Sequence, residues 1–205
     1  MIAIIDYDAG NIKSVEKAIQ FLGGEVIVTR DAEEILKATH VILPGVGSFG
    51  DAIRKLEEYN LIPVIRQVVA NKTPFLGICL GLQLLFESSD ESPGVDGLGL
   101  LKGKIKRIPD GNNLKIPHIG WNALTYPIKG RLYHGIEENS YVYFVHSYYL
   151  KAEEEIVTAA TEYGTYIHAS VEKDNIFACQ FHPEKSSDVG LKILKNFLDI
   201  KKEEL

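Results

Sequence analysis

The chain has 205 residues, of which 45% are apolar and 24% charged, as in a globular protein with one sizeable core or two small ones. Its net charge of -6 offers no broad cationic face, which argues against nucleic acid or an anionic membrane as the main partner. The start, MIAIIDYD, has no basic segment before its short apolar run, so we expect neither a signal peptide nor a membrane span. Without a secretion signal, we expect a cytoplasmic protein whose two cysteines, Cys79 and Cys179, are free thiols.

The first part of the chain alternates strand and helix patterns. Compact apolar runs predict buried strands at 2–5, 25–29, 41–43 and 75–78. Apolar residues at helical spacing predict helices at 12–22, 31–37, around 52–56, 61–70 and 80–86. This succession predicts an α/β fold with a mostly parallel central sheet and helices on both of its faces.

The pattern changes after Ser88. A loop rich in Gly, Ser and acidic residues is followed by short strand candidates at 104–108, 116–124, 141–150, 156–161, 166–172 and 176–181. A last amphipathic helix is predicted at roughly 189–200. Because no Pro/Gly-rich linker separates the two parts, we expect antiparallel or mixed strands added to the same core, in a single domain of residues 1–205.

Cys79 lies in GICLG, where a predicted strand meets a predicted helix. A G-x-C-x-G sequence at such a junction is the pattern of a nucleophile elbow, with cysteine in place of serine. Gly77 and Gly81 remove side chains that would collide at the bend. The start of a helix favours a thiolate, and the backbone N–H groups that follow can face an oxyanion. For the elbow taken alone, a buried structural cysteine is the alternative interpretation.

A thiol nucleophile requires a histidine base and a group that orients the base. Of the six histidines, only His182 ends a strong apolar strand pattern with a carboxylate two residues later, in FACQFHPEKS. In extended backbone these two side chains lie on one face, and Pro183 keeps His182 extended. A polar turn at a strand end is the alternative. Together with the elbow, the pattern predicts a triad of Cys79, His182 and Glu184.

The stretch LPGVGSFG follows the predicted strand 41–43. In a parallel sheet it lies at the carboxyl edge, where ligands bind. Gly45 and Gly47 allow backbone amides to approach a bound group and to act as a second oxyanion donor. A Gly-rich turn that leads into a helix is the alternative, and the absence of a following G-K-[ST] argues against a phosphate loop.

The other histidines are interpreted as structural. His118 and His134 have no cysteine or carboxylate at metal-ligand spacing, and His146 and His168 lie on predicted strands. We therefore expect no metal and no cofactor.

Three motifs, GICLGLQ, LPGVGSF and FHPEKS, together resemble the class I (triad) glutamine amidotransferases over nearly the whole chain. Further motifs, YDAGNIKSV, KIPHIGWN and YFVHSYY, resemble the group of glutaminase subunits of imidazole glycerol phosphate synthase. The resemblance implies a flavodoxin-like fold and hydrolysis of L-glutamine to L-glutamate and ammonia through a cysteinyl thioester. It also implies that ammonia passes to a (β/α)8-barrel cyclase subunit, the partner in a heterodimer of histidine biosynthesis.

The resemblance assigns roles to individual residues. Cys79 attacks the glutamine amide, His182 takes its proton and gives it to ammonia, and Glu184 orients His182. The groups implied for the oxyanion and for substrate belong to Gly45, Val46, Gly47, Leu80, Gln83, His146, Ser147 and Tyr148. The residues that resemble interface or gate positions are Asn11, Trp121, Tyr143 and Lys185. For Trp121 a half-buried core position is an equal alternative.

Two other functions are weighed against this one. A related amidotransferase could serve another acceptor, such as a pyridoxal phosphate synthase, but KIPHIGWN and PGVGSF argue against it. A non-catalytic binding protein of the same fold would have little reason to keep the complete Cys-His-Glu set. The flexible Pro-Gly-Val-Gly stretch leads to one further hypothesis, that the isolated chain is nearly inactive because segment 45–47 is wrongly oriented.

Overall fold

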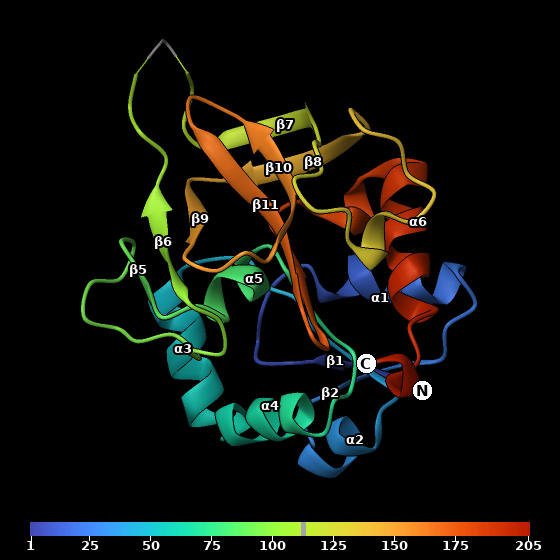
Figure 1. Cartoon of the computed structure of the whole chain (residues 1–205). Helices are drawn as coiled ribbons and strands as arrows, with labels where there is room; N and C mark the ends of the chain where they lie inside the picture. The colour runs from blue at the N-terminus through green and yellow to red at the C-terminus, as the bar shows by residue number, and fades with distance from the viewer. Residues whose placement is uncertain (112–113) are drawn as a thin grey trace.

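A twisted sheet runs through the molecule and carries helices on both faces (Figure 1). The computed structural model describes residues 1–111 and 114–205, and within them ten strands form this sheet. Its order is β2-β1-β3-β4-β12-β11-β9-β6-β5, with β10 paired to β11. The strands are β1 (Ile2–Ile5), β2 (Val26–Thr29), β3 (His40–Leu43), β4 (Phe75–Ile78), β5 (Ser88–Ser89), β6 (Gly103–Arg107), β9 (Tyr148–Ala152), β10 (Val157–Glu162), β11 (Tyr166–Lys173) and β12 (Ile176–Cys179).

The first five strands in this order, β2, β1, β3, β4 and β12, are parallel. Antiparallel pairs then link β12, β11, β9 and β6. The predicted α/β class, with a mostly parallel sheet and an added antiparallel region, is confirmed. The C-terminal strand β12 pairs with β4 in parallel, with Cys179 opposite Ile78, so the ends of these two strands are neighbours.

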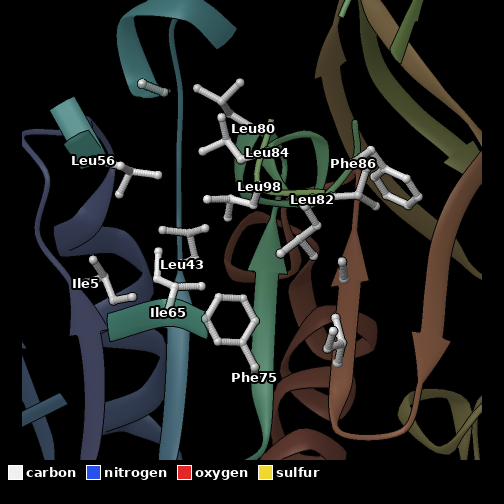
Figure 2. Packing of buried hydrophobic residues seen from close by; sticks show 14 of the residues in the cluster. Ile5, Leu43, Leu56, Ile65, Phe75, Leu80, Leu82, Leu84, Phe86 and Leu98 are labelled. Atoms are coloured by element: carbon white, nitrogen blue, oxygen red, sulfur yellow. The ribbon is translucent and has the colours of Figure 1, made fainter. Parts of the chain in front are cut away.

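Two apolar layers hold the helices against the sheet. The helices are α1 (Ile12–Phe21), α2 (Ala32–Lys37), α3 (Phe49–Glu58), α4 (Leu61–Ala70), α5 (Leu80–Leu84) and α6 (Ser187–Leu198). Alternation along β1 sends Ala3 and Ile5 into the layer of α2 to α5, and Ile2 and Ile4 into the layer of α1 and α6. Figure 2 shows the first layer, where each buried Leu, Ile or Phe side chain stabilises the fold by about 1.5–3 kcal/mol.

Two helices begin at side-chain caps. The Asp31 carboxylate accepts from the Glu34 amide at 3.0 Å at the start of α2, and the Ser48 hydroxyl accepts from the Asp51 amide at 3.3 Å at the start of α3. The second cap starts α3 directly after the glycine-rich stretch, so that stretch remains a loop at the carboxyl edge of the sheet.

The structure differs from the prediction mainly at three places. The strand expected at 141–150 is two strands, β8 (Tyr141–His146) and β9, which belong to different sheets. β8 pairs with β7 (His118–Ala123) in a separate antiparallel pair. Both strands have one buried face, so their alternation continues across the junction and hides it. The helix expected at 80–86 ends at Leu84, and β5 lies in the expected loop.

Among the helices of the described residues, none combines the length and the apolar character needed to cross a lipid bilayer. Cys79 and Cys179 are free thiols, as expected, and Cys179 is fully buried in β12.

Candidate active site

The bend expected at GICLG is present at Cys79. This residue follows β4, starts α5 and has φ 55° and ψ -107°. Its amide donates to the Cys179 carbonyl at 2.8 Å, so the bend is attached to β12. A Cβ on Gly81 would lie 1.9 Å from the carbonyl oxygen of Leu43, and one on Gly77 would lie 2.7 Å from the carbonyl oxygen of Gly81. The two flanking glycines are therefore needed for the chain to pass through this bend.

His182 lies at the same edge of the sheet as Cys79. It follows β12 as Cys79 follows β4, and these strands are parallel neighbours. Its Nδ1 lies 2.7 Å from Oε1 of Glu184, and both side chains are buried. The same carboxylate oxygen accepts from Nδ2 of Asn11 at 2.5 Å. The structure thus places the three residues expected as a triad at one edge of the sheet and adds Asn11, which was expected only at an interface.

The surroundings of His182 favour its charged form. Burial opposes the imidazolium, but the interactions with Cys79 and Glu184 outweigh it and raise the pKa of His182 to about 10. Nδ1 is engaged by Glu184, which leaves Nε2 for the thiol. Among the described residues, this Nε2 has no well-aligned hydrogen-bond partner.

Cys79 opens into a cavity of about 300 Å³. Seven of the eight residues expected for the oxyanion or the substrate also line this cavity. They are Val46, Gly47, Leu80, Gln83, His146, Ser147 and Tyr148. Sequence reasoning missed three further lining residues, Glu91, Pro117 and Val145. Glu91 lies in the acidic loop, where its carboxylate accepts from the Phe49 amide at 2.8 Å, a contact that no local pattern announces.

The side-chain amides of Gln83 and Gln180 form a hydrogen-bonded pair beside this cavity. Gln83 Nε2 donates to Gln180 Oε1 at 3.0 Å and to the Tyr148 carbonyl at 3.1 Å. Gln180 Nε2 in turn lies 3.7 Å from Sγ of Cys79. Gln180 was missed, although a fully buried amide two residues before His182 is a signal that could have identified it. Within residues 1–111 and 114–205, no three His, Cys, Asp or Glu side chains gather in a way that could hold a metal ion.

Comparison with known proteins identifies the family. The family Glutamine amidotransferase class-I matches residues 3–200. The chain belongs to the class-I glutamine amidotransferases.

Individual relatives refine this membership. The chain is 51% identical to an imidazole glycerol phosphate synthase subunit HisH of Bacillus cereus (strain G9842), over 96% of this chain and 93% of that protein. It is 47% identical to the HisH subunit of Methanocaldococcus jannaschii, over 98% of this chain and 100% of that protein. Among solved structures, a glutamine amidotransferase superposes with a TM-score of 0.75 at 19% identity, covering 97% of this chain and 98% of that one. This likeness concerns the fold alone.

In this amidotransferase the glycine-rich loop presents a carbonyl to α5. The Leu80 amide, expected as an oxyanion donor, donates to the Gly45 carbonyl at 3.3 Å. Gly45 itself does not line the cavity. Tyr7 fills the space behind it, because its hydroxyl donates to the Pro44 carbonyl at 2.7 Å and would lie 2.3 Å from a Cβ on Gly45. Gly47 has φ +101°, a backbone conformation that favours glycine.

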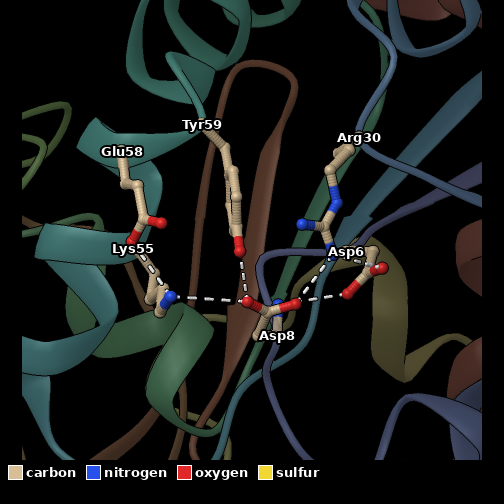
Figure 3. Close-up of polar contacts among 6 residues, drawn as sticks. All are labelled: Asp6, Asp8, Arg30, Lys55, Glu58 and Tyr59. Atoms are coloured by element: carbon tan, nitrogen blue, oxygen red, sulfur yellow. Dashed lines mark hydrogen bonds and ion pairs between the residues drawn. The ribbon is translucent and has the colours of Figure 1, made fainter.

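A network of ion pairs braces the segment of the amidotransferase that carries Asn11 (Figure 3). The Arg30 guanidinium lies 2.8 Å from both Asp6 and Asp8. Hydrogen bonds from Tyr59 and Arg30 lower the pKa of Asp8 to about 2. The residues of this network are Asp6, Asp8, Arg30, Lys55, Glu58 and Tyr59. Asp6 and Asp8 precede Asn11 by a few residues, so the network holds the loop from which Asn11 reaches Glu184.

The outward face of the β7–β8 pair exposes apolar side chains. Trp121 is 50% exposed and lies opposite Tyr143 in the register, with ring centroids 6.0 Å apart. Ile119 and Tyr141, which are 60% and 57% exposed, lie on the same face. Trp121 is therefore a surface residue rather than a core residue. Lys185 is also exposed, in the short 3-10 helix Pro183–Lys185 that follows His182.

Proposed function

We propose that this chain is the glutaminase subunit of an imidazole glycerol phosphate synthase and that it hydrolyses L-glutamine to L-glutamate and ammonia. The observation that carries the proposal is that Cys79 and His182 follow neighbouring parallel strands, β4 and β12, and that Cys79 lines a cavity of about 300 Å³. The Glu184 carboxylate 2.7 Å from His182 supports the assignment of a nucleophile, an acid–base group and an orienting group. The high identity to HisH proteins supports this synthase rather than one with another acceptor.

The first half of the reaction forms a thioester. The Cys79 thiolate attacks the carbon of the glutamine side-chain amide, and a C–S bond forms. The C–N bond then breaks while His182 gives its Nε2 proton to the leaving nitrogen. Ammonia departs, His182 becomes neutral, and the γ-glutamyl group remains on sulfur.

The second half consumes water. Neutral His182 takes a proton from a water molecule as the water oxygen bonds to the acyl carbon. The C–S bond breaks, glutamate forms, and the Cys79 thiolate and the His182 imidazolium are restored. Throughout, Glu184 keeps the ring oriented through Nδ1, and Asn11 holds the same carboxylate oxygen with its Nδ2 at 2.5 Å.

Glutamine is assigned to the cavity next to Cys79, with its amino-acid end against the backbone of residues 146–148 and near Gln83. The oxyanion is assigned to the amides of Leu80 and of the 45–47 segment. Because the Leu80 amide already donates to Gly45, this assignment requires the segment to reorient before the chemistry begins. The proposal therefore includes a resting state and an active state of the loop.

The partner is proposed to be a (β/α)8-barrel cyclase that docks on the apolar face around Trp121 and Tyr143, with Asn11 and Lys185 at its border. This face is continuous with the cavity, because Val145 lies opposite Ile119 in the hairpin and also lines the cavity. Direct transfer keeps ammonia from protonating to ammonium, which is not a nucleophile. The proposal treats residues 1–205 as one domain of a heterodimer in a reducing cytoplasm, where both thiols stay reduced.

The test mixes the chain with a candidate barrel cyclase and follows glutamine hydrolysis with and without the cyclase substrate, a phosphorylated ribulosyl imidazole-carboxamide. Strong stimulation by that substrate is expected. A rate indifferent to cyclase and substrate would refute this assignment and favour another acceptor. Cys79→Ala should abolish synthesis from glutamine and leave synthesis from added ammonium intact. If both are lost, the variant has failed to fold or dock.

A further inference from the structure

The inner face of the β7–β8 pair carries two buried histidines that the proposed chemistry does not use. His118 and His146 are directly opposite each other in the register, and His118 is only 2% exposed. Nδ1 of His118 lies 3.3 Å from Nε2 of His146, and Nδ1 of His146 lies 2.8 Å from the Tyr148 carbonyl oxygen. A short series of hydrogen bonds thus leads from the hairpin to the backbone at Tyr148.

These contacts determine which ring nitrogens carry hydrogen. A carbonyl oxygen only accepts, so Nδ1 of His146 is the donor to Tyr148. In a neutral ring Nε2 of His146 is then an acceptor, and Nδ1 of His118 donates to it. Burial lowers the pKa of His118 to about 4 and that of His146 to about 3, so both rings are neutral at pH 7. The direction of both hydrogen bonds is therefore defined.

Aromatic neighbours restrain the first ring of the series. His118 stacks on Tyr163 with centroids 3.8 Å apart and planes 16° from parallel, and on Phe144 at 4.8 Å and 19°. The Tyr163 hydroxyl donates to the Lys115 carbonyl at 2.7 Å, which fixes this ring in turn. His118 therefore presents its N–H group in one direction.

The series of hydrogen bonds ends at Tyr148, next to the junction of β8 and β9, where hydrogen bonds between strands hold the backbone only in part. Ser147 lies between β8 and β9, where the backbone passes from one sheet to the other. The Ile108 amide donates to the Ser147 carbonyl at 2.9 Å, whereas the Tyr148 carbonyl accepts from two side chains, Gln83 and His146. Residues 146–148 and Gln83 all line the cavity of Cys79. Side-chain hydrogen bonds thus set the shape of this wall.

We propose that His118 is a positioning residue for glutamine binding, which acts through His146 on the backbone of residues 146–148. The proposal rests on the glutaminase function proposed above. Without the His118 N–H group, Nε2 of His146 becomes a buried acceptor with no donor, and the segment is free to change its conformation. Because Cys79, His182 and Glu184 are not part of the series, substrate binding is affected more than the chemical steps.

The test compares His118→Phe, His118→Asn and His118→Gln in the complex with the barrel cyclase. Phenylalanine keeps a stacking ring without an N–H group, asparagine places an amide donor near the position of Nδ1, and glutamine places it near that of Nε2. We expect His118→Phe to raise the KM for glutamine about tenfold while kcat stays within about threefold. The KM of His118→Asn should be close to that of the unsubstituted chain, whereas the KM of His118→Gln should stay raised.

A matched control is His40→Phe. His40 is a partly buried histidine next to a phenylalanine ring, and its Nε2 lies 2.9 Å from the Ile200 carbonyl, at the amino edge of the sheet. This variant should leave the KM unchanged. An unchanged KM in His118→Phe, or equal KM values in the asparagine and glutamine variants, would mean that the ring only packs.

Histidine 15N NMR of the unsubstituted chain gives a readout that needs no turnover. Both His118 and His146 should carry hydrogen on Nδ1, and hydrogen on Nε2 of His146 would overturn the proposal whether or not the variants fold. A complex that hydrolyses no glutamine at all would refute the proposed function instead, so the two failures are distinct.

Discussion

The Leu80 backbone amide donates to the Gly45 carbonyl oxygen across 3.3 Å. This contact uses the amide that should stabilise the oxyanion and places a carbonyl dipole beside it. A carbonyl oxygen repels the negative charge that develops on the substrate oxygen during attack. We infer that this conformation of the loop is the resting one, and the hypothesis that segment 45–47 must reorient stays a prediction.

We predict that the isolated chain hydrolyses glutamine at least about a hundredfold more slowly than its complex with the cyclase, since loss of one oxyanion donor typically costs about 10²–10³ in kcat. The measurement is kcat at saturating glutamine with and without the partner. Alkylation of Cys79 by iodoacetamide is the control, because it needs no oxyanion donor and should proceed at similar rates in both. Equal kcat values would contradict the resting-loop interpretation.

The bend at Cys79 should tolerate no side chain at position 81. In Gly81→Ala the new Cβ would lie 1.9 Å from the Leu43 carbonyl oxygen, so the elbow or β3 must move. We expect the free energy of unfolding to fall by more than about 3 kcal/mol, measured by urea denaturation.

Gly94→Ala is the control for that variant. Gly94 has φ +84°, and no described atom lies within 4 Å of a Cβ built there, so only backbone strain of about 1 kcal/mol is expected. Similar losses of unfolding free energy in Gly81→Ala and Gly94→Ala would show that the close approach at the elbow contributes little to the destabilisation.

Removing the Glu184 charge should change how stability depends on pH. In Glu184→Gln we expect the pKa of His182 to fall below about 10, as followed by NMR, with only the contribution of Cys79 left to raise it. Because the folded-state pKa lies above the unfolded value, the interaction stabilises the fold in full below pH 6.5 and is lost as pH rises to about 10.

The free energy of unfolding, measured by urea denaturation, should therefore differ most between Glu184→Gln and the unsubstituted chain at the acidic end of this pH range. The difference should be least at the alkaline end. Glu33→Gln is the control, since Glu33 pairs with Lys37 on the exposed surface and its loss should be small at every pH. A stability difference for Glu184→Gln that grows with pH would reverse the sign and refute the charged pair.

The exposed indole of Trp121 should be an anchor for the partner. Trp121→Ala is expected to weaken cyclase binding by about 2–4 kcal/mol, measured by titration calorimetry, with little change in the stability of the isolated chain. Phe21→Ala is the control and removes a more exposed ring, 77% accessible, from the C-terminal end of α1, at the amino edge of the sheet. If both variants bind the cyclase as tightly as the unsubstituted chain, the docking face lies elsewhere.

Much of the site could be predicted because its chemistry is local in the chain. Gly77 and Gly81 on either side of Cys79 indicate a bend, since only glycine leaves room there. His182 and Glu184 are two residues apart in extended backbone, so one can reach the other without any knowledge of the fold. Their meeting with Cys79 needed only the general rule that parallel strands share one carboxyl edge.

Other contacts of the site could not be predicted from the sequence because they join segments that are far apart in the chain. Asn11 reaches Glu184 from the opposite end of the chain, and Gln180 contacts both Gln83 and Cys79. The division of 141–150 into two strands was missed because alternation does not show which sheet a strand joins. That division is also what places His146 opposite His118.

The sequence by itself determined the α/β pattern and the elbow, and it indicated the three side chains that we propose to react, because periodicity and glycine spacing act over a few residues. Only the tertiary structure decided which way the Gly45 carbonyl points, which donors hold Glu184 and which hydrogen bonds reach Tyr148. Each of these depends on the relative placement of segments far apart in the chain, and that placement comes from the packing of the whole sheet and its helices.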